Sequence, residues 1–264
     1  MITALNWIVD HTFGYLVKLI FWLIDLILPD TYTRVITKYS LMFYEGIKYT
    51  LLISLVGTII GFLIACIFGT LRSIDTSKRD TLFKKIVFKV IDFIIRIYVT
   101  VFRGTPMMVQ AMIIYYGLVG IVHWSAVEAS LFIVSINTGA YLTEVIHNGI
   151  KSIDRGQLEA ARSLGFSYPK SMFYIIFPQA LKNSMASIGN EFVINIKDTS
   201  VLNVIGCAEM YYILKISSGE DYRYMETMIV GAIIYLILTL TTTKLLGLIE
   251  KKMGVKAQEI RSSN

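Results

Sequence analysis

Polar side chains recur at helical spacing inside two otherwise apolar stretches of the chain. Asn137, Tyr141, Glu144 and Asn148 follow one another by three or four residues, so one helix face would carry all of them. A second face would carry Ser184, Ser187, Glu191, Asn195 and Asp198, with Lys197 beside it. An ionisable group at membrane depth costs about 3 kcal/mol or more, so both faces should line a bundle interior or a water-filled cavity. Such faces could bind a polar or charged solute through hydrogen bonds and ion pairs.

Two interpretations of these faces remain open. Their residues could line a substrate path, for which we select Asn137, Tyr141, Glu144, Glu191, Asn195, Lys197 and Asp198. Alternatively they could join helices, with Lys197 and Asp198 neutralising partners on neighbouring spans. Asp198 is the first candidate to bind a substrate ammonium or cationic side chain. Glu144 is the second, unless it pairs with Arg103 or Lys197.

The run Arg103–Gly104–Thr105–Pro106 offers a different kind of polar group, the free backbone. Pro106 lacks an N–H and Gly104 lets the chain bend, so a helix breaks or starts here. Amide and carbonyl groups at a broken helix could hold the charged ends of a zwitterion. A simple helix start with Pro106 in its first turn is the alternative. Thr105 and Gln110 join the substrate-path candidates.

The sequence offers no catalytic constellation and no site for a metal or a nucleotide. Cys66 and Cys207 have no metal or redox spacing, and the 3 histidines are scattered. A phosphate-binding GxxxxGK[ST] loop is missing, because no glycine in the chain precedes a lysine. We therefore expect no enzyme activity, metal or cofactor on this chain, and any ATP hydrolysis would come from another polypeptide.

Composition indicates an integral membrane protein. Hydrophobic residues make up 55% of the chain and the mean hydropathy is +0.62. Apolar runs able to cross about 30 Å of hydrocarbon fall near residues 46–71, 104–122, 126–146, 182–206 and 226–249. Because no ten-residue alternating strands occur, we expect an all-α bundle with five core helices.

Lysine and arginine predict how this bundle is oriented. Residues 72–96 hold seven of them, residues 147–182 hold five and the tail 251–264 holds four, whereas residues 207–225 hold two. The positive-inside rule then places residues 72–96, residues 147–182 and the C-terminus in the cytoplasm. The net charge of +6 reports membrane topology on this interpretation, and we expect no nucleic-acid partner.

Residues 1–43 precede the predicted core domain, 44–250. They contain an apolar run at 7–28 that is interrupted by Asp10, Lys18 and Asp25. No basic region precedes this run and no small-residue cleavage site follows it, so we do not expect a signal peptide. A sixth span and a helix lying in the membrane interface both remain open.

A basic, polar segment at residues 150–178 separates the third and fourth predicted spans. Asp154 and Gln157 have the spacing of a capping box, which predicts a helix from about Arg155. Gly165 suits a left-handed helix end. Ser167 could cap a second short helix, and Pro178 would start the next apolar run. This predicts a helix–turn–helix carrying small alanines, which is either shaped to fit closely against a partner or is an ordinary cytoplasmic connector.

The segment also resembles the EAA loop of bacterial ABC importer permeases. Its pattern consists of Glu159-Ala160-Ala161, Gly165 and Ile175-x-Phe177-Pro178, where the family usually ends Ile-x-Leu-Pro. Residues 102–110, 139–144 and 197–200 are similar to the polar amino-acid branch of that family. His147-Asn148 stand where that branch usually has Arg-Gly. The resemblance covers roughly residues 44–250.

This resemblance implies a type I importer transmembrane domain in a bacterial cell membrane. Its partners would be two cytoplasmic ATPase subunits that bind ATP and Mg, a second permease subunit, identical or related, and an extracellular binding protein. The substrate would be an amino acid, polar or charged. Glu159, Ala160, Ala161 and Gly165 would couple the ATPase to transport. An ion-coupled carrier or intramembrane enzyme working alone is the other class; it would need an inverted repeat or catalytic residues, and the sequence shows neither.

Overall fold

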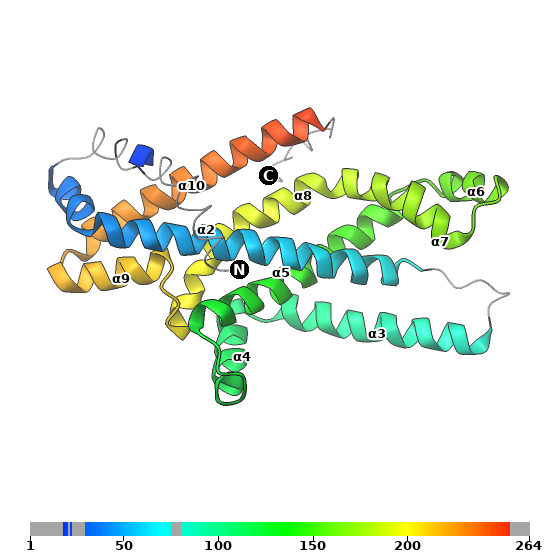
Figure 1. The fold of residues 1–264 in the computed structure, drawn as a ribbon, viewed down its shortest axis with the longest axis horizontal. Coiled ribbons are helices and arrows are strands. Elements are labelled where there is room, and N and C mark those ends of the chain that lie inside the picture. The colour runs from blue at the N-terminus through cyan, green and yellow to red at the C-terminus, as the bar shows by residue number, and fades with distance from the viewer. Residues whose placement is uncertain (1–17, 21, 23–29, 75–80, 254–264) are drawn as a thin grey trace. The chain divides into compact units, whose positions relative to one another are not determined.

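The computed structural model describes residues 18–20, 22, 30–74 and 81–253, and every regular element in these ranges is a helix (Figure 1). The all-α prediction is therefore confirmed for this part of the chain. The chain divides into two compact units, and their boundaries fall within long helices. Unit 1 comprises Met1–Gly57, Met107–Val134 and Phe192–Thr243. Unit 2 comprises Thr58–Pro106, Ser135–Glu191 and Lys244–Asn264.

The helices follow the predicted order along the chain. They are α2 (Asp30–Arg72), α3 (Leu82–Gly104), α4 (Met107–Val122), α5 (Ala126–Lys151), α6 (Arg155–Ser163), α7 (Tyr168–Ser171), the π-helix η1 (Met172–Ile176), α8 (Phe177–Asp198), the 3-10 helix η2 (Thr199–Ile205), α9 (Met210–Asp221) and α10 (Tyr224–Lys252). The five predicted core spans overlap α2, α4, α5, α8 with η2, and α10. The second span begins at Gly104, the last residue of α3, and the fourth ends at Gly206, one residue past η2.

Three helices of the described chain are long and apolar enough to cross a membrane. They are Tyr32–Arg72, Ala126–Lys151 and Tyr224–Lys252. The helix α4 is apolar but shorter, and α8 carries charged side chains such as Glu191 and Lys197 that lower its hydropathy. For α4 and α8 the crossing of the membrane stays a prediction.

One predicted boundary differs from the structure. The helix α2 begins at Asp30, so residues 30–43, expected as a connector, form the first turns of the same helix as the first core span. The buried residues Val35, Tyr39 and Phe43 give this part an apolar face, which stabilises helix where we expected a linker. Most of the run 7–28 lies outside the described residues; Lys18–Ile20 and Trp22 are helical.

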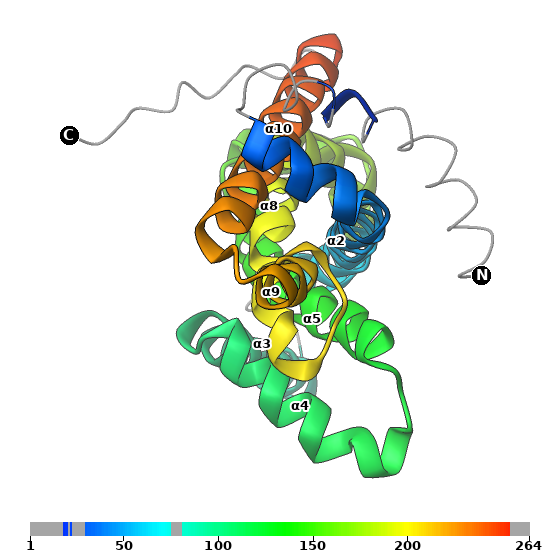
Figure 2. The ribbon, with the colours of Figure 1, turned by 90° about the vertical axis from the view of Figure 1, so that its left-hand side faces the viewer.

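Unit 1 has two apolar clusters. Phe43 and Ile47 of α2 are fully buried with Met210 of α9 and Ile234 of α10. A second cluster joins α2, α4, α5 and η2 through Ile53, Ala111, Ile133 and Leu202. The helix α4 packs against η2 (Figure 2). There the Tyr116 hydroxyl donates a hydrogen bond to the Val204 carbonyl (3.2 Å).

A buried carboxylate caps α9 in unit 1. Glu209 is 0% exposed and accepts hydrogen bonds from the backbone N–H groups of Tyr211 (2.9 Å) and Tyr212 (2.8 Å). The hydroxyl of Tyr235 also donates to it (3.1 Å). Burial disfavours the charged form and raises the pKa of Glu209 to about 7, although these three hydrogen bonds act in the opposite direction.

In unit 2, small residues of α2 let α5 approach closely. A Cβ atom added to Gly61 would lie 2.9 Å from the backbone nitrogen of Gly139, and one added to Gly69 would lie 2.9 Å from Cβ of Ile146. Ala65 between them is fully buried. A larger side chain at position 61 or 69 would therefore force the two helices apart.

Glu209 predicts a pH dependence of stability. The folded protein holds a proton on Glu209 up to about pH 7, whereas the unfolded chain releases it near the ordinary value of 4.5. The free energy of unfolding should therefore fall as pH rises through that interval. We expect Glu209→Gln to remove this part of the fall, measured as thermal unfolding midpoints of the purified protein between about pH 5 and pH 8. Glu220→Gln, on the exposed end of α9, is the control. An equal fall in both variants and in the unmodified protein would show that Glu209 ionises normally.

Candidate functional site

The candidate coupling site is the elbow, which we define as residues 154–171. Its first helix, α6, starts where predicted: the Asp154 carboxylate accepts a hydrogen bond from the N–H of Gly156 (2.6 Å). At its end Gly165 has φ +85°, and the N–H of Phe166 donates to the carbonyl of Ala161 (3.1 Å). These bonds close the helix with a left-handed turn, which confirms the predicted stop.

The second half of the elbow differs from the prediction. Ser167 occupies the N-cap position of α7, but its side chain makes no capping hydrogen bond. After one turn, α7 passes directly into the π-helix η1, where the N–H of Phe177 donates to the carbonyl of Met172, and then into α8. Because Pro178 has no N–H, it cannot continue the regular α-helical pattern, and a wide turn precedes it. The elbow therefore leads into α8 without a loop.

The helix α6 has a buried side and an exposed side. Ala161 is 2% exposed and Leu158 is partly buried, so this side of α6 packs on the rest of unit 2. Glu159 and Ala160 are exposed, and Leu164 is 79% exposed at the end of the helix. A carboxylate, a small residue and an apolar side chain are thus presented together, as a docking helix requires.

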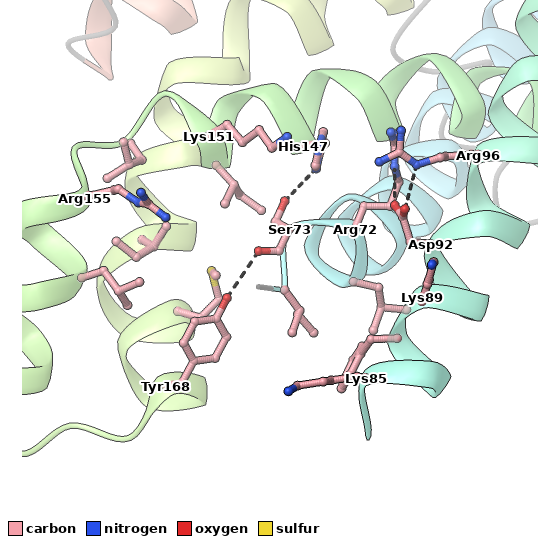
Figure 3. A pocket seen from close by; sticks show the side chains of 18 of the residues that line it. Arg72, Ser73, Lys85, Lys89, Asp92, Arg96, His147, Lys151, Arg155 and Tyr168 are labelled. Atoms are coloured by element: carbon pink, nitrogen blue, oxygen red, sulfur yellow. Dashed lines mark hydrogen bonds and ion pairs between the residues drawn. The ribbon is translucent and has the colours of Figure 1, made fainter. Parts of the chain in front are cut away.

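The elbow is tied to the ends of two long helices through Ser73 (Figure 3). The Tyr168 hydroxyl donates a hydrogen bond to the backbone carbonyl of Ser73 (3.3 Å), and the Ser73 hydroxyl lies 2.9 Å from Nδ1 of His147 in α5. The same hydroxyl donates to the carbonyl of Gly69 in α2 (2.7 Å). Displacement of α7 would therefore be transmitted to α2 and α5. Ser73 and Tyr168 could not be selected from the sequence, because their partners are distant along the chain.

A buried arginine lies one residue before Ser73. The Arg72 side chain is 6% exposed; its guanidinium is 2.5 Å from the Glu144 carboxylate and 3.5 Å from that of Asp92. Asp92 also accepts a hydrogen bond from Arg96 (2.7 Å). Glu144 was expected either to line the substrate path or to pair with Arg103 or Lys197. Its ion-pair partner is Arg72, because α2 continues far enough to bring that side chain against α5.

The break between α3 and α4 lies beside other predicted residues of unit 2. Thr105 has extended backbone, and its hydroxyl donates to the carbonyl of Val101 (2.8 Å). The side-chain amide of Asn137 donates to the carbonyl of Phe102 (3.4 Å), and the Arg103 guanidinium lies 5.3 Å from the centre of the Tyr141 ring. Thr105, Asn137 and Tyr141 are thus grouped at this break. Glu191 is partly buried in the same unit.

The remaining candidates belong to unit 1. Gln110 and Asn195 are buried, at 6% and 3% exposed, whereas Lys197 and Asp198 are exposed where α8 changes into η2. Their predicted roles in a substrate path stay predictions. Within the described ranges no group of three or more His, Cys, Asp and Glu side chains could hold a metal ion. Each unit has polar side chains that could bind a solute, and the helix ends joined through Ser73 in unit 2 could move together.

Comparison with known proteins shows to which class of protein this chain is similar. The family model described as binding-protein-dependent transport system inner membrane component matches residues 85–255. The arginine transport system permease protein ArtQ of Bacillus subtilis (strain 168) is 34% identical over 215 residues, covering 79% of this chain and 91% of that protein. The glutamine transport system permease protein GlnP of Escherichia coli (strain K12) is 31% identical over 214 residues, covering 80% and 92%.

Solved structures agree. A crystal structure of an amino acid ABC transporter with histidines matches with a TM-score of 0.71 and 36% identity, covering 82% of this chain and 96% of that one. An inward-facing structure of the MetNI methionine ABC transporter matches with a TM-score of 0.68 at 17% identity, covering 82% and 98%, and supports the fold alone. The fold is that of an ABC importer transmembrane domain.

This chain belongs to the family of inner membrane components of binding-protein-dependent transport systems. The resemblance carried by the EAA-like segment is thereby confirmed, and the chain is an integral membrane permease subunit.

The Arg72 ion pairs predict a stability loss with a clear control. Arg72→Met would leave the carboxylates of Glu144 and Asp92 without their shared cation, and we expect the free energy of unfolding to fall by about 2–3 kcal/mol. Arg96→Met, at a side chain 59% exposed, should lower it by about 1 kcal/mol or less. Denaturation of the purified variants in detergent measures both. Similar losses in the two variants would contradict a special role for Arg72.

Proposed function

We propose that this chain is the permease subunit of an amino-acid importer whose energy comes from a separate ATPase subunit. The elbow is the observation that carries the proposal: α6 has caps at both ends, buries Ala161 and presents Glu159, Ala160 and Leu164 outward. The names of its relatives, an arginine and a glutamine transport permease, support an amino acid as substrate.

The proposed setting is a bacterial cell membrane with the elbow and the C-terminus in the cytoplasm. Lysine and arginine in residues 72–96, in residues 147–182 and after residue 250 support this orientation. Figure 1 is consistent with it, because α6, α7, the start of α3 and the end of α2 lie at the same end of unit 2. The ATPase subunits would meet the elbow on this side, and a binding protein would deliver the substrate on the other.

The proposed mechanism is alternating access driven through the elbow. Two ATPase subunits, which bind ATP and Mg, close on each other and displace α6. Tyr168 and Ser73 connect the elbow to α2 and α5, so these helices tilt with it. A second permease subunit, identical or related, would complete the path. Each cycle would then expose the substrate site first outward and then inward.

Each unit by itself offers polar groups that we propose as substrate contacts. In unit 1, Asp198 would attract the ammonium or a cationic side chain, with Gln110, Asn195 and Lys197 as further polar groups. In unit 2, Thr105, Asn137 and Tyr141 surround the helix break, where free backbone groups could bind a zwitterion. Glu191 and Glu144 complete the set, although the ion pair with Arg72 makes Glu144 primarily a structural residue.

Charge reversal on α6 tests the coupling role. Glu159→Lys should lower the substrate-stimulated ATP hydrolysis of the assembled complex about tenfold or more, because the docking surface would repel its partner. Gly165→Val should have the same effect, since a β-branched residue strongly disfavours φ +85°. Glu220→Lys, an exposed residue of α9, is the matched control. Normal substrate-stimulated hydrolysis in both elbow variants would refute the proposal.

Asp198 predicts a loss of substrate affinity. Asp198→Ala should raise the KM of uptake about tenfold for a substrate whose cationic group it binds, because one charged hydrogen bond is lost. Assembly with the ATPase should be unchanged, as measured by copurification. Asn190→Ala, at an exposed residue of α8 outside the proposed path, serves as the control for local disturbance of the helix. Uptake by Asp198→Ala with unchanged KM and rate for every amino acid would remove Asp198 from the path.

A further inference from the structure

A basic pocket lies between the elbow and the ends of the long helices of unit 2 (Figure 3). It has a volume of about 660 Å³ and is formed by the end of α2, the first half of α3, the end of α5, and the elbow helices α6 and α7. Six lysine and arginine side chains line it: Arg72, Lys85, Lys89, Arg96, Lys151 and Arg155. Only two carboxylates line it with them, Asp92 and Asp154.

Both carboxylates already interact with the protein. Asp92 accepts from Arg96 and faces Arg72, and Asp154 accepts from the N–H of Gly156 to cap α6. Six basic side chains against two carboxylates leave four positive charges, and Arg72 also pairs with Glu144 outside the lining, so the net excess is three. Figure 3 shows Lys85 and Lys89 of α3 on one side of the pocket, with Lys151 and Arg155 across from them. This distribution attracts a compact anion with several acceptor oxygens, such as a phosphate.

A second, apolar pocket lies along the same two helices. It has a volume of about 540 Å³ and a wholly apolar lining from α2, α3 and one residue of α5. Ile64 and Phe68 of α2 face Ile91 and Ile94 of α3 across it. Leu71 lines both this pocket and the basic one. A soluble phosphate would make no use of the apolar pocket, whereas a hydrocarbon chain would fill it.

The exposed surface of α3 also fits a lipid environment. Phe83, Ile86, Phe93 and Ile97 are each about half or more exposed along this helix. Lysine side chains lie between them, so α3 combines apolar surface with basic groups, the pattern of a helix in the membrane interface. Both pockets therefore lie beside surface that favours membrane lipid.

We propose that the basic and apolar pockets together bind one anionic phospholipid. Its phosphate binds among Lys85, Lys89, Lys151 and Arg155, and one acyl chain lies in the apolar pocket between α2 and α3. Since the elbow helices form one wall of the headgroup site, the bound lipid stabilises the elbow on unit 2. That the lipid comes from the cytoplasmic leaflet rests on the proposed function; the binding itself does not.

Lipid binding to the purified full-length complex tests this proposal. The complex is placed in nanodiscs of phosphatidylcholine that contain a small fraction of fluorescent phosphatidylglycerol. Energy transfer between the protein and the fluorescent lipid reports binding. We expect Lys85→Gln/Lys89→Gln to weaken phosphatidylglycerol binding roughly 30-fold, because each basic residue near an anionic lipid contributes about a fivefold factor. Lys84→Gln/Lys182→Gln removes the same charge outside the pocket and should bind like the unmodified complex.

The apolar half of the site needs its own variant. Ile94 is exposed and lines the apolar pocket, so Ile94→Trp fills that pocket without disturbing the buried core. We expect it to weaken phosphatidylglycerol binding, whereas Ile97→Trp, exposed on the same helix but outside the pocket, should not. An unchanged size-exclusion profile and an unchanged thermal unfolding midpoint show that each variant is folded, so a loss of lipid is assigned to the site.

Three results would overturn the proposal. Equal binding of phosphatidylglycerol and phosphatidylcholine would mean that the basic pocket does not select an anion. Equal losses in the two lysine double variants would mean that general surface charge holds the lipid. Displacement of the lipid by millimolar inorganic phosphate, together with unchanged binding to Ile94→Trp, would identify a free-phosphate site. Because no transport is measured, failure here is distinguishable from failure of the importer proposal.

Discussion

The end of unit 2 that contains the elbow depends on the ion pairs of the Arg72 guanidinium. A buried cation is stable only when its charge is neutralised, and Glu144 of α5 and Asp92 of α3 both lie within ion-pair distance of it. This requirement fixes the end of α2, the middle of α3 and the second half of α5 relative to one another. Because Arg72 stands in the last turn of α2, it also complements the negative end of that helix.

The position of the elbow depends on these ion pairs. Ser73 follows Arg72 directly, and through Ser73 both His147 and Tyr168 connect to the end of α2. The small residues Gly61, Ala65 and Gly69 bring α2 close to α5 before the ion pairs are reached. A force applied at α6 therefore acts on a packed group of helices, which is the mechanical requirement for coupling to an external ATPase.

What could be predicted from the sequence depended on local interactions. The bounds of α6 follow from Asp154 and Gly165, since a cap acts within a few residues of its own position. The partner of Glu144 could not be predicted, because Arg72 lies 72 residues away and only the packing of α2 on α5 brings them together. The length of α2 was also missed: polar residues in 30–43 indicate a connector, whereas Val35, Tyr39 and Phe43 pack into a core formed by distant helices. The π-helix before Pro178 likewise has no simple sequence signature.

Site-specific crosslinking shows most directly whether the elbow contacts a separate ATPase subunit. A photo-crosslinking amino acid would replace Leu164, which is 79% exposed at the end of α6, or Tyr222, which is 95% exposed after α9. We expect position 164 to crosslink to the ATPase subunit in intact membranes, whereas position 222 should not. Crosslinks from position 164 to lipid or to an extracellular binding protein alone, in a complex that still transports, would contradict this expectation.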